Sequence, residues 1–300
     1  MTILEQLSLA GIIPVVKIEK VEQALPLAEA LLQADLNAIE ITFRTTAAAD
    51  VIRTISQHHP EMLIGAGTVL TRQQVDLAIE AGAQFIVTPG FNPDTVAYCI
   101  EKKIPIIPGC SSPTDIEAAL SFDLTTVKFF PAEQLGGIAT IKALSGPYSQ
   151  VRFIATGGIN VSNFKDYLSV SKVAAIAGSW MVAPELLNNG QYDLISDLSK
   201  QAVQAMLDFK IESISLNTQD PSEHNVIKEW TTCLNNQITH QESKKSRGII
   251  TISTPDIKRA LHFLQRHQLK AKPDSLQPTS HSTGVDFNAI AGYEIKLTQR

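Results

Sequence analysis

The chain has 300 residues, of which 44% are hydrophobic and 18% are charged, as is typical of a globular protein with one large domain or two unequal ones. Its formal net charge is −5 and it contains no basic tract, which argues against binding to nucleic acid or to an anionic membrane surface. A small-molecule substrate is therefore the favoured class of partner.

The cysteines and the N-terminal segment favour a reducing, cytoplasmic location. Cys99, Cys110 and Cys233 are far apart and lack CxxC spacing, so they predict neither a disulfide framework nor a zinc site. The apolar run LAGIIPVV near the start is too short to span a bilayer and has no basic region before it. We therefore expect no signal peptide and no membrane anchor.

A helix is expected over residues 2–10, and short apolar runs then recur every 20 or so residues. These runs are IIPVVKI (12–18), AIEITF (38–43), LIGAGTV (63–69), FIVTPG (85–90), IPIIPG (104–109), TVKFFP (126–131), RFIATGG (152–158) and AAIAGSW (174–180). Helical patterns such as VEQALPLAEALLQA and TRQQVDLAIEAGA lie between them. The alternation predicts an α/β chain whose residues 1–207 form a (β/α)8 TIM barrel with an added N-terminal helix. An open doubly wound sheet is the competing fold, but it does not need eight strands, and no GxGxxG follows the first one.

Polar residues at the carboxyl ends of barrel strands are candidate site residues, because active sites of this fold gather there. In IEITFRT, the alternation of side chains along a strand places Glu40, Thr42 and Arg44 on one face. Glu40 is then a candidate proton carrier, and Arg44 is a candidate for bidentate binding of a carboxylate. A purely structural Glu–Arg pair is the alternative.

The third and fourth strands end in residues that can shape the rim of the barrel. GAGTV offers two glycines, which let the backbone approach a ligand closely, and the hydroxyl of Thr68. Pro89 in TPGF removes a backbone donor and fixes φ at the end of its strand. A structural role accounts equally well for Pro89.

Lys128 lies in the apolar run TVKFFP, where desolvation favours the neutral form of an amine, and a neutral lysine is a nucleophile. It shares a strand face with Phe130, whereas Val127 and Phe129 face the helices, so its amine is expected to point toward the barrel mouth near Glu40. The alternative is a lysine on an edge strand whose amine reaches water.

ATGGIN after the seventh strand and AGSW at the end of the eighth indicate a phosphate site. Loops at these two places often bind phosphate through backbone N–H groups, where glycine permits close approach. Gly157, Gly158 and Ser179 fit this role, so a substrate phosphorylated at one end is expected.

Over about residues 3–207 the sequence resembles the 2-keto-3-deoxy-6-phosphogluconate (KDPG) and 4-hydroxy-2-oxoglutarate aldolases. The resemblance is carried, in order, by EITFRT, GAGTVL, TPGF, PIIPG, VKFFPAE, GPYSQVRFIATGGI and AGSW. It implies a lyase that needs no metal or other cofactor, in a cytoplasmic homotrimer, with Lys128 as the Schiff-base lysine and Glu40 as the general acid/base. It also implies that Arg44 and Thr68 hold the substrate carboxylate, that Pro89 and Phe130 line the pocket, and that Thr156, Gly157, Gly158 and Ser179 surround the phosphate.

The implied reaction cleaves 2-dehydro-3-deoxy-6-phosphogluconate to pyruvate and glyceraldehyde 3-phosphate, with 4-hydroxy-2-oxoglutarate as a second substrate. Two alternatives stay open. The first is the aldolase for the 6-phosphogalactonate epimer, which differs only at C4. The second is a non-catalytic phosphate-binding barrel with a sensor or assembly tail.

Residues 208–300 are predicted to form a small, non-catalytic α+β module. Strands are expected at IESISLNT and GIITIST, helices at PSEHNVIKEWTTCLNN and PDIKRALHFLQRHQ, an exposed turn at QESKKS, and a terminal hairpin in FNAIAGYEIKLTQ. The element order and GYEIKL resemble glyoxalase-type (vicinal oxygen chelate) modules. Metal enzymes of that group need ligands on their strands. Here only Glu294 is suitably placed, Ser213 or Ser215 stands where a His would be sought, and five histidines are expected on helices or loops: His224, His240, His262, His267 and His281.

Overall fold

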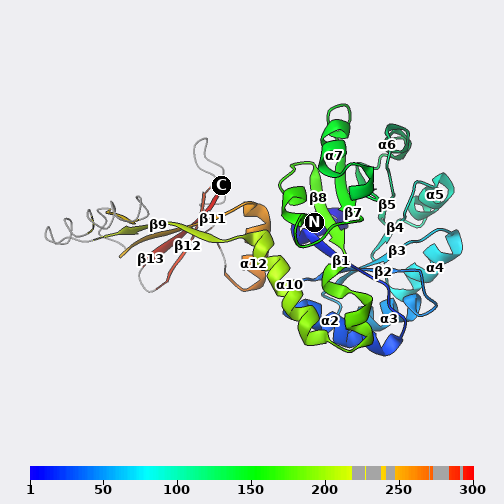
Figure 1. The fold of residues 1–300 in the computed structure, drawn as a ribbon, viewed down its shortest axis with the longest axis horizontal. Helices are drawn as coiled ribbons and strands as arrows, with labels where there is room; N and C mark the ends of the chain where they lie inside the picture. Colours follow the sequence, from blue (N-terminus) through cyan, green and yellow to red (C-terminus); the bar gives the residue numbers. More distant parts are fainter. Residues whose placement is uncertain (218–226, 228–237, 241–246, 270, 273–283, 291–292) are drawn as a thin grey trace. The chain divides into compact units, whose positions relative to one another are not determined.

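A computed structural model describes residues 1–217, 227, 238–240, 247–269, 271–272, 284–290 and 293–300. The chain divides into two compact units, Met1–Met206 and Leu207–Arg300. Each unit has its own sheet (Figure 1). The predicted helix over PSEHNVIKEWTTCLNN and the turn at QESKKS lie outside the described residues, apart from residue 227.

The first unit is the (β/α)8 barrel. Its parallel strands are β1 (Ile12–Val16), β2 (Ala38–Thr42), β3 (Leu63–Gly67), β4 (Phe85–Val87), β5 (Ile106–Ile107), β6 (Thr126–Phe129), β7 (Arg152–Thr156) and β8 (Val173–Gly178). They follow the order β5-β4-β3-β2-β1-β8-β7-β6, and a parallel bridge between Gly109 and Lys128 joins the two ends. All eight expected strands are therefore present, and the sheet closes on itself.

Helices alternate with these strands. They are α1 (Ile3–Ala10), α2 (Ala24–Gln33), α3 (Ala48–His58), α4 (Arg72–Ala81), α5 (Pro93–Glu101), α6 (Pro113–Leu120), α7 (Gly137–Ser145), α8 (Phe164–Leu168), α9 (Pro184–Asn188) and α10 (Tyr192–Leu207), with short 3-10 turns η1 (Val21–Gln23), η2 (Glu133–Leu135) and η3 (Trp180–Val182). Local sequence explains where many begin. Ser112 and Asp115 form a capping box at α6, and Asn92 caps α5.

The strand faces that point inward form an apolar layer inside the barrel. Buried side chains from seven strands cluster with Leu7 of α1; they are Ile13, Ala38, Leu63, Phe85, Val87, Ile107, Ile154, Ala174, Ala175 and Ala177. The predicted N-terminal helix thus contributes to this core. Glu40 lies one alternation step beyond Ala38 along β2, so its side chain lies next to this apolar layer.

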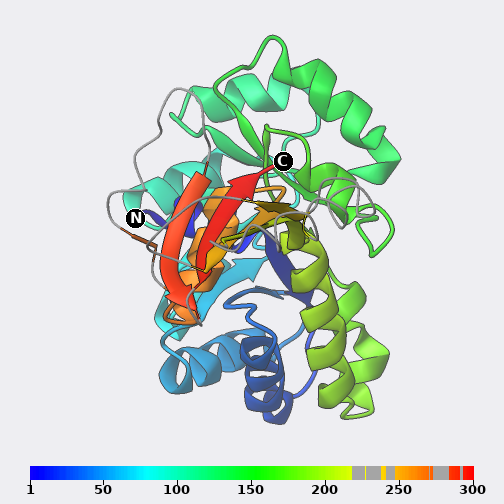
Figure 2. The same cartoon turned by 90° about the vertical axis from the view of Figure 1, so that its left-hand side faces the viewer.

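The second unit has a five-stranded sheet, β10-β9-β11-β13-β12. Its elements are β9 (Lys210–Leu216), β10 (Ile238–His240), β11 (Gly248–Thr254), α12 (Ile257–Arg266), β12 (Gly284–Ile290) and β13 (Tyr293–Gln299). The expected strands at β9 and β11, the helix α12 and the closing hairpin β12–β13 are all present (Figure 2). His240 lies in strand β10, not on a helix or loop as expected.

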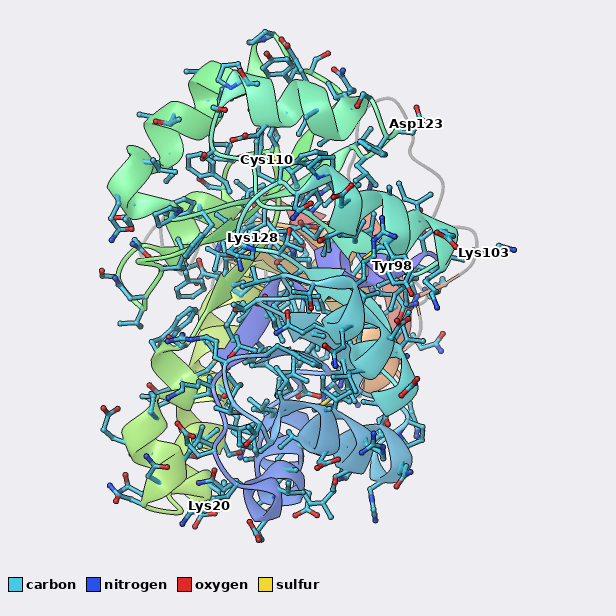
Figure 3. All side chains as sticks on the ribbon, turned by 90° about the vertical axis from the view of Figure 1, so that its right-hand side faces the viewer. Lys20, Tyr98, Lys103, Cys110, Asp123 and Lys128 are labelled. Atoms are coloured by element: carbon cyan, nitrogen blue, oxygen red, sulfur yellow. The ribbon has the colours of Figure 1, made fainter. Side chains whose placement is uncertain are left out.

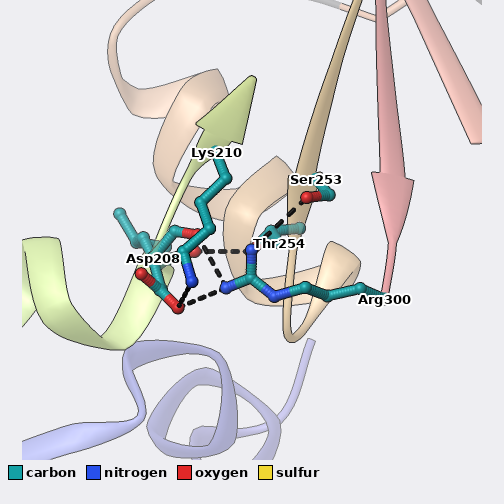
Figure 4. A network of polar contacts seen from close by, with 6 residues as sticks. Asp208, Lys210, Ser253, Thr254 and Arg300 are labelled. Carbon is teal, nitrogen blue, oxygen red and sulfur yellow. Dashed lines mark hydrogen bonds and ion pairs between the residues drawn. The ribbon is translucent and has the colours of Figure 1, made fainter. Parts of the chain in front are cut away.

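Polar contacts fasten the end of this unit to its beginning. The Arg300 guanidinium donates to the backbone oxygen of Asp208 at 2.9 Å, forms an ion pair with its carboxylate, and donates to the Ser253 hydroxyl at 3.3 Å (Figure 4). The Thr254 hydroxyl donates to the Leu207 oxygen at 2.7 Å. The last residue of the chain and the first residues of the unit are therefore held as neighbours.

Candidate active site

Lys128 and Glu40 meet inside the barrel. The Lys128 Nζ lies 3.6 Å from the Glu40 Oε1, and the two side chains are only 7% and 3% exposed. Figure 3 shows Lys128 toward the middle of the barrel unit, whereas Lys20 and Lys103 lie at its periphery. A buried amine facing a buried carboxylate, next to an apolar layer, is the arrangement expected of a nucleophile with a proton carrier beside it.

The closure of the barrel fixes the backbone of Lys128. Its N–H donates to the Pro108 oxygen at 2.9 Å, and its oxygen accepts from the Cys110 N–H at 2.8 Å. Its amine lies 5.0 Å from the centroid of the Phe130 ring, within range of a cation–π contact. The predicted proximity of Lys128, Phe130 and Glu40 is thus present in the structure.

Glu40 is held in a space that a glycine leaves open. A Cβ on Gly67, in the neighbouring strand, would lie 2.1 Å from the Glu40 Oε1. That oxygen is buried and has no hydrogen-bond partner among the described residues. It lies within ion-pair distance of the Lys128 amine but accepts no hydrogen bond in the described part of the chain, so it is left able to exchange a proton with a group that enters the site.

Arg44 lies beyond the strand that was expected to place it. β2 ends at Thr42, whose hydroxyl donates to the Val16 oxygen at 2.9 Å. Arg44 lies in the following turn, where its N–H donates to the Thr42 oxygen at 2.7 Å, and its side chain is exposed. Strand alternation therefore explains the position of Glu40 but not that of Arg44.

Thr68 and Pro89 follow the ends of β3 and β4 and are partly buried. Thr68 has a φ of 55°, a conformation uncommon for a threonine. The backbone oxygen of Pro89 would lie 2.2 Å from a Cβ on Gly109, so these two rim segments are in close contact. Both residues thus belong to the rim at the carboxyl ends of the strands.

The turn after β7 is held against the segment that follows β6. The Ala132 N–H donates to the Thr156 oxygen at 2.8 Å, and the Glu133 N–H donates to the Gly157 oxygen at 3.1 Å. Gly157 and Gly158 have φ values of 99° and 78°, which favour glycine. The Thr156 Oγ1 is buried and has no hydrogen-bond partner in the described part of the chain.

Ser179 follows directly after β8, and its side chain is exposed. It lies at the carboxyl end of the strand next to β7, so it shares the end of the barrel where the glycine turn lies. The two segments that predicted a phosphate site are thus neighbours in the structure.

Sequence reasoning missed three residues that shape this region. Gly67 was expected only to let the backbone approach a ligand closely, yet it provides the space for Glu40. Asn160 and Asn163 both donate to the Gly158 oxygen, at 3.2 and 3.0 Å. Two asparagines three residues apart, beginning two residues after a glycine pair, were the signal that could have revealed them.

The buried thiols do not compete with Lys128 as nucleophiles. Burial raises the pKa of Cys99 to about 12, and burial together with the nearby Asp115 raises the pKa of Cys110 to about 12. Both thiols are therefore protonated at neutral pH, and a thiol is a far weaker nucleophile than its thiolate.

Metal clusters and membrane-spanning helices are both absent from the described residues. No group of three or more His, Cys, Asp or Glu side chains in this part of the chain is placed to hold a metal ion. None of the helices within the described ranges has the length and apolar character needed to cross a membrane.

Comparison with known proteins places these features in a family. The family model described as KDPG and KHG aldolase matches residues 3–198. A 2-dehydro-3-deoxy-phosphogluconate aldolase of Treponema pallidum is 49% identical over 203 residues, which are 68% of this chain and 97% of the relative. The KHG/KDPG aldolase of Escherichia coli K12 is 42% identical over 198 residues, 66% of this chain and 93% of the relative.

A solved structure gives the same result. The KDPG aldolase of Legionella pneumophila, with pyruvate captured as a covalent carbinolamine intermediate, matches with a TM-score of 0.65 and 38% identity, over 66% of this chain and 97% of that chain.

Proposed function

The chain belongs to the KDPG and KHG aldolase family, and from this premise we propose that it is a class I aldolase acting through Lys128. The reaction is the cleavage of 2-dehydro-3-deoxy-6-phosphogluconate to pyruvate and glyceraldehyde 3-phosphate. The observation that carries the proposal is the 3.6 Å approach of the Lys128 Nζ to the Glu40 Oε1, both buried. The carbinolamine described for the Legionella relative supports the same chemistry, because it is the first adduct of an amine with a ketone.

The first half of the reaction joins the substrate to the protein. The unprotonated Lys128 amine attacks the C2 ketone and forms a carbinolamine, and loss of water then gives an iminium ion. Glu40 carries the protons: it protonates the hydroxyl that leaves as water and accepts the proton that the amine loses. No oxidant, metal or cofactor enters this balance.

The second half breaks the C3–C4 bond. Glu40 takes the proton of the C4 hydroxyl, the electrons of the C3–C4 bond move into the iminium, and glyceraldehyde 3-phosphate leaves. The enamine that remains on Lys128 takes a proton at C3, and water releases it as pyruvate. The buried setting strengthens each of these electrostatic interactions, because little water screens them.

The remaining residues hold the two ends of the substrate. Arg44 and Thr68 bind the carboxylate, which turns the ketone toward Lys128, and Pro89 and Phe130 line the pocket. At the other end, the phosphate lies among Thr156, Gly157, Gly158 and Ser179. The side chain of Arg44 is exposed, so binding the carboxylate requires its guanidinium to turn over the site. Thr156, at the phosphate end, already has a buried hydroxyl without a hydrogen bond to the described residues.

A second substrate is favoured by one relative. The Escherichia coli protein, at 42% identity, is named a KHG/KDPG aldolase, so we include cleavage of 4-hydroxy-2-oxoglutarate to pyruvate and glyoxylate in the proposal. The working form is proposed to be a cytoplasmic homotrimer, with the second unit in a non-catalytic role.

Trapping with borohydride tests the proposal. Pyruvate and borohydride should label the native protein at Lys128, which peptide mass mapping would locate, and Lys128→Ala should abolish both the labelling and turnover. Labelling of another lysine would overturn the assignment. Absence of any labelling would favour the non-catalytic phosphate-binding barrel.

A coupled assay then resolves the substrate. The assay compares three substrates: 2-dehydro-3-deoxy-6-phosphogluconate, its 6-phosphogalactonate epimer at C4, and 4-hydroxy-2-oxoglutarate. The gluconate epimer should give the highest kcat/KM. A higher value for the galactonate epimer would replace the proposed substrate while leaving the Schiff-base chemistry intact.

A further inference from the structure

The turn at Gly157 and Gly158 has its backbone oxygens held by three successive sets of donors. The first two donors are backbone N–H groups of the segment after β6, which bind the oxygens of Thr156 and Gly157. In the described part of the chain, the third oxygen, that of Gly158, accepts only from side chains: the Asn160 Nδ2 at 3.2 Å and the Asn163 Nδ2 at 3.0 Å. The orientation of the third peptide therefore depends on side chains that can be replaced.

Holding an oxygen also sets the direction of the next N–H. A trans peptide is planar, so its C=O and N–H point in opposite directions. The amides on the Gly158 oxygen thus turn the N–H of Ile159 to the opposite side, just as the contacts on Thr156 and Gly157 turn the N–H groups of Gly157 and Gly158. Phosphate binding at a glycine turn relies on such oriented N–H groups.

The two asparagines are themselves fixed by the same short loop. The Asn163 Oδ1 accepts from the Asn160 N–H at 2.8 Å, and the Asn160 Oδ1 accepts from the Ser162 N–H at 2.8 Å. Each side chain therefore uses its oxygen to hold the loop and its nitrogen to hold the Gly158 oxygen. This division permits the two tasks to be separated by substitution.

We propose that Asn163 and Asn160 are positioning residues for the phosphate end of the substrate, acting through the Gly158 peptide. The proposal rests on the proposed function, because it assumes that a phosphorylated substrate occupies this turn. It assigns to these residues the discrimination between substrates with and without a phosphate. Their proposed action is on the Gly158 peptide and not on the carbon atoms that react.

Asn163→Asp and Asn160→Asp test this with little change in shape. The carboxylate keeps an oxygen that accepts from the loop, but it cannot donate to the Gly158 oxygen. Each lost hydrogen bond should raise the KM for the phosphorylated substrate by about tenfold, with kcat within about twofold of its starting value. The kcat/KM for 4-hydroxy-2-oxoglutarate, which has no phosphate, should stay within about twofold as well.

The control separates charge from orientation. Val161 lies in the same loop and is 67% exposed, so Val161→Asp adds the same charge without removing a donor to Gly158. We expect its KM for the phosphorylated substrate to change by less than about threefold, since an exposed charge is screened by solvent and salt. An equal rise in Val161→Asp and Asn163→Asp would assign the effect to charge and overturn the proposal.

Two further outcomes would overturn it. The first is that the double variant Asn160→Asp/Asn163→Asp has an unchanged KM for the phosphorylated substrate. The second is that kcat/KM falls equally for phosphorylated and unphosphorylated substrates and Tm is lowered, because a purely structural role would give that result.

A binding measurement keeps this test separate from the proposed function. Inorganic phosphate is titrated into the full-length protein by calorimetry, and Asn163→Asp should weaken its binding while Val161→Asp leaves it unchanged. Borohydride trapping of pyruvate at Lys128 should be equal in all these variants. Failure of trapping in the unaltered protein would refute the aldolase proposal, whereas equal phosphate affinity in every variant would refute only the role of the asparagines.

Discussion

Gly67 limits where the Glu40 carboxylate can lie. A Cβ there would lie 2.1 Å from the Glu40 Oε1, far inside contact distance, and Gly67 does not have a positive φ that would itself oppose alanine. Gly67→Ala should therefore displace Glu40 while leaving strand β3 in place. We expect kcat to fall by about 100-fold, the scale for a catalytic group misplaced by about 1 Å.

The double variant Gly67→Ala/Glu40→Gln shows whether the effect passes through Glu40. If it does, the two losses are strongly non-additive, and kcat of the double variant matches that of Glu40→Gln. Gly146→Ala is the matched control, because a Cβ there meets its nearest neighbour, the Ala143 oxygen, at an ordinary 3.5 Å. Additive losses would place the effect of Gly67 outside the catalytic pair.

Glu40→Gln tests the proton carrier directly. Glutamine keeps the size of the side chain and an oxygen that accepts hydrogen bonds, but it cannot take up or release a proton at neutral pH. We expect imine formation with pyruvate and cleavage of the full substrate to slow by about 100-fold or more. The measurements are the rate of borohydride trapping and kcat.

The exposed carboxylate of Glu22 provides the comparison. Glu22→Gln makes the same chemical change outside the barrel interior and should leave both rates unchanged. Unchanged rates in Glu40→Gln as well would leave Glu40 as a structural partner of Lys128.

At the level of single residues, sequence periodicity predicted the positions of site residues that lie within strands, but not of those that lie in turns. Glu40 and Lys128 lie within β2 and β6, where alternation determines the face on which a side chain lies. Arg44 lies two residues past the end of β2, and alternation does not apply in a turn. Gly67 could not be assigned its role, because the need for space depends on a side chain of the neighbouring strand.

At the level of elements, the apolar runs predicted every barrel strand but not where each one ends. Strands of a parallel barrel are buried on both faces, so they read as continuous apolar runs with no internal mark of their last hydrogen-bonded residue. β5 shows this most clearly: the expected segment of residues 104–109 contains a strand of two residues, Ile106–Ile107. Pro105 and Pro108 flank it, and neither can donate to a neighbouring strand.

The short β5 has a consequence for the site. With little strand available, the barrel closes through the bridge between Gly109 and Lys128. A Cβ on Gly109 would lie 2.2 Å from the Pro89 oxygen, so this closure also requires a residue without a side chain at position 109. The backbone of the proposed nucleophile is therefore part of the seam that closes the barrel, which limits its freedom to move.

At the level of the whole molecule, the sequence predicted a second unit but not all of its elements. The strands β9 and β11, the helix α12 and the hairpin β12–β13 follow the expected order, because each has a clear periodic pattern. The three-residue strand β10, which holds His240 and pairs in parallel with β9, was missed. A strand of that length has too few residues to show an alternating pattern, so its pairing depends on the sheet that receives it.

The relatives bear on what the second unit contributes to catalysis. The match to the Treponema pallidum protein covers 97% of that relative with 203 residues, so that aldolase is a chain of about the length of the first unit. Residues 1–207, expressed alone, should therefore fold and keep kcat and KM within about twofold of the full chain. This expectation is supported by the contacts of Lys128, because its ion pair with Glu40 and its backbone hydrogen bonds with Pro108 and Cys110 all lie within the first unit.

Steady-state kinetics and thermal unfolding of the two forms, compared at equal molar concentration, are the measurements. A folded fragment with kcat reduced by more than about tenfold would show that the second unit supports catalysis. A change confined to Tm or to the mass of the assembled protein would instead assign that unit to stability or association, the non-catalytic role proposed for it.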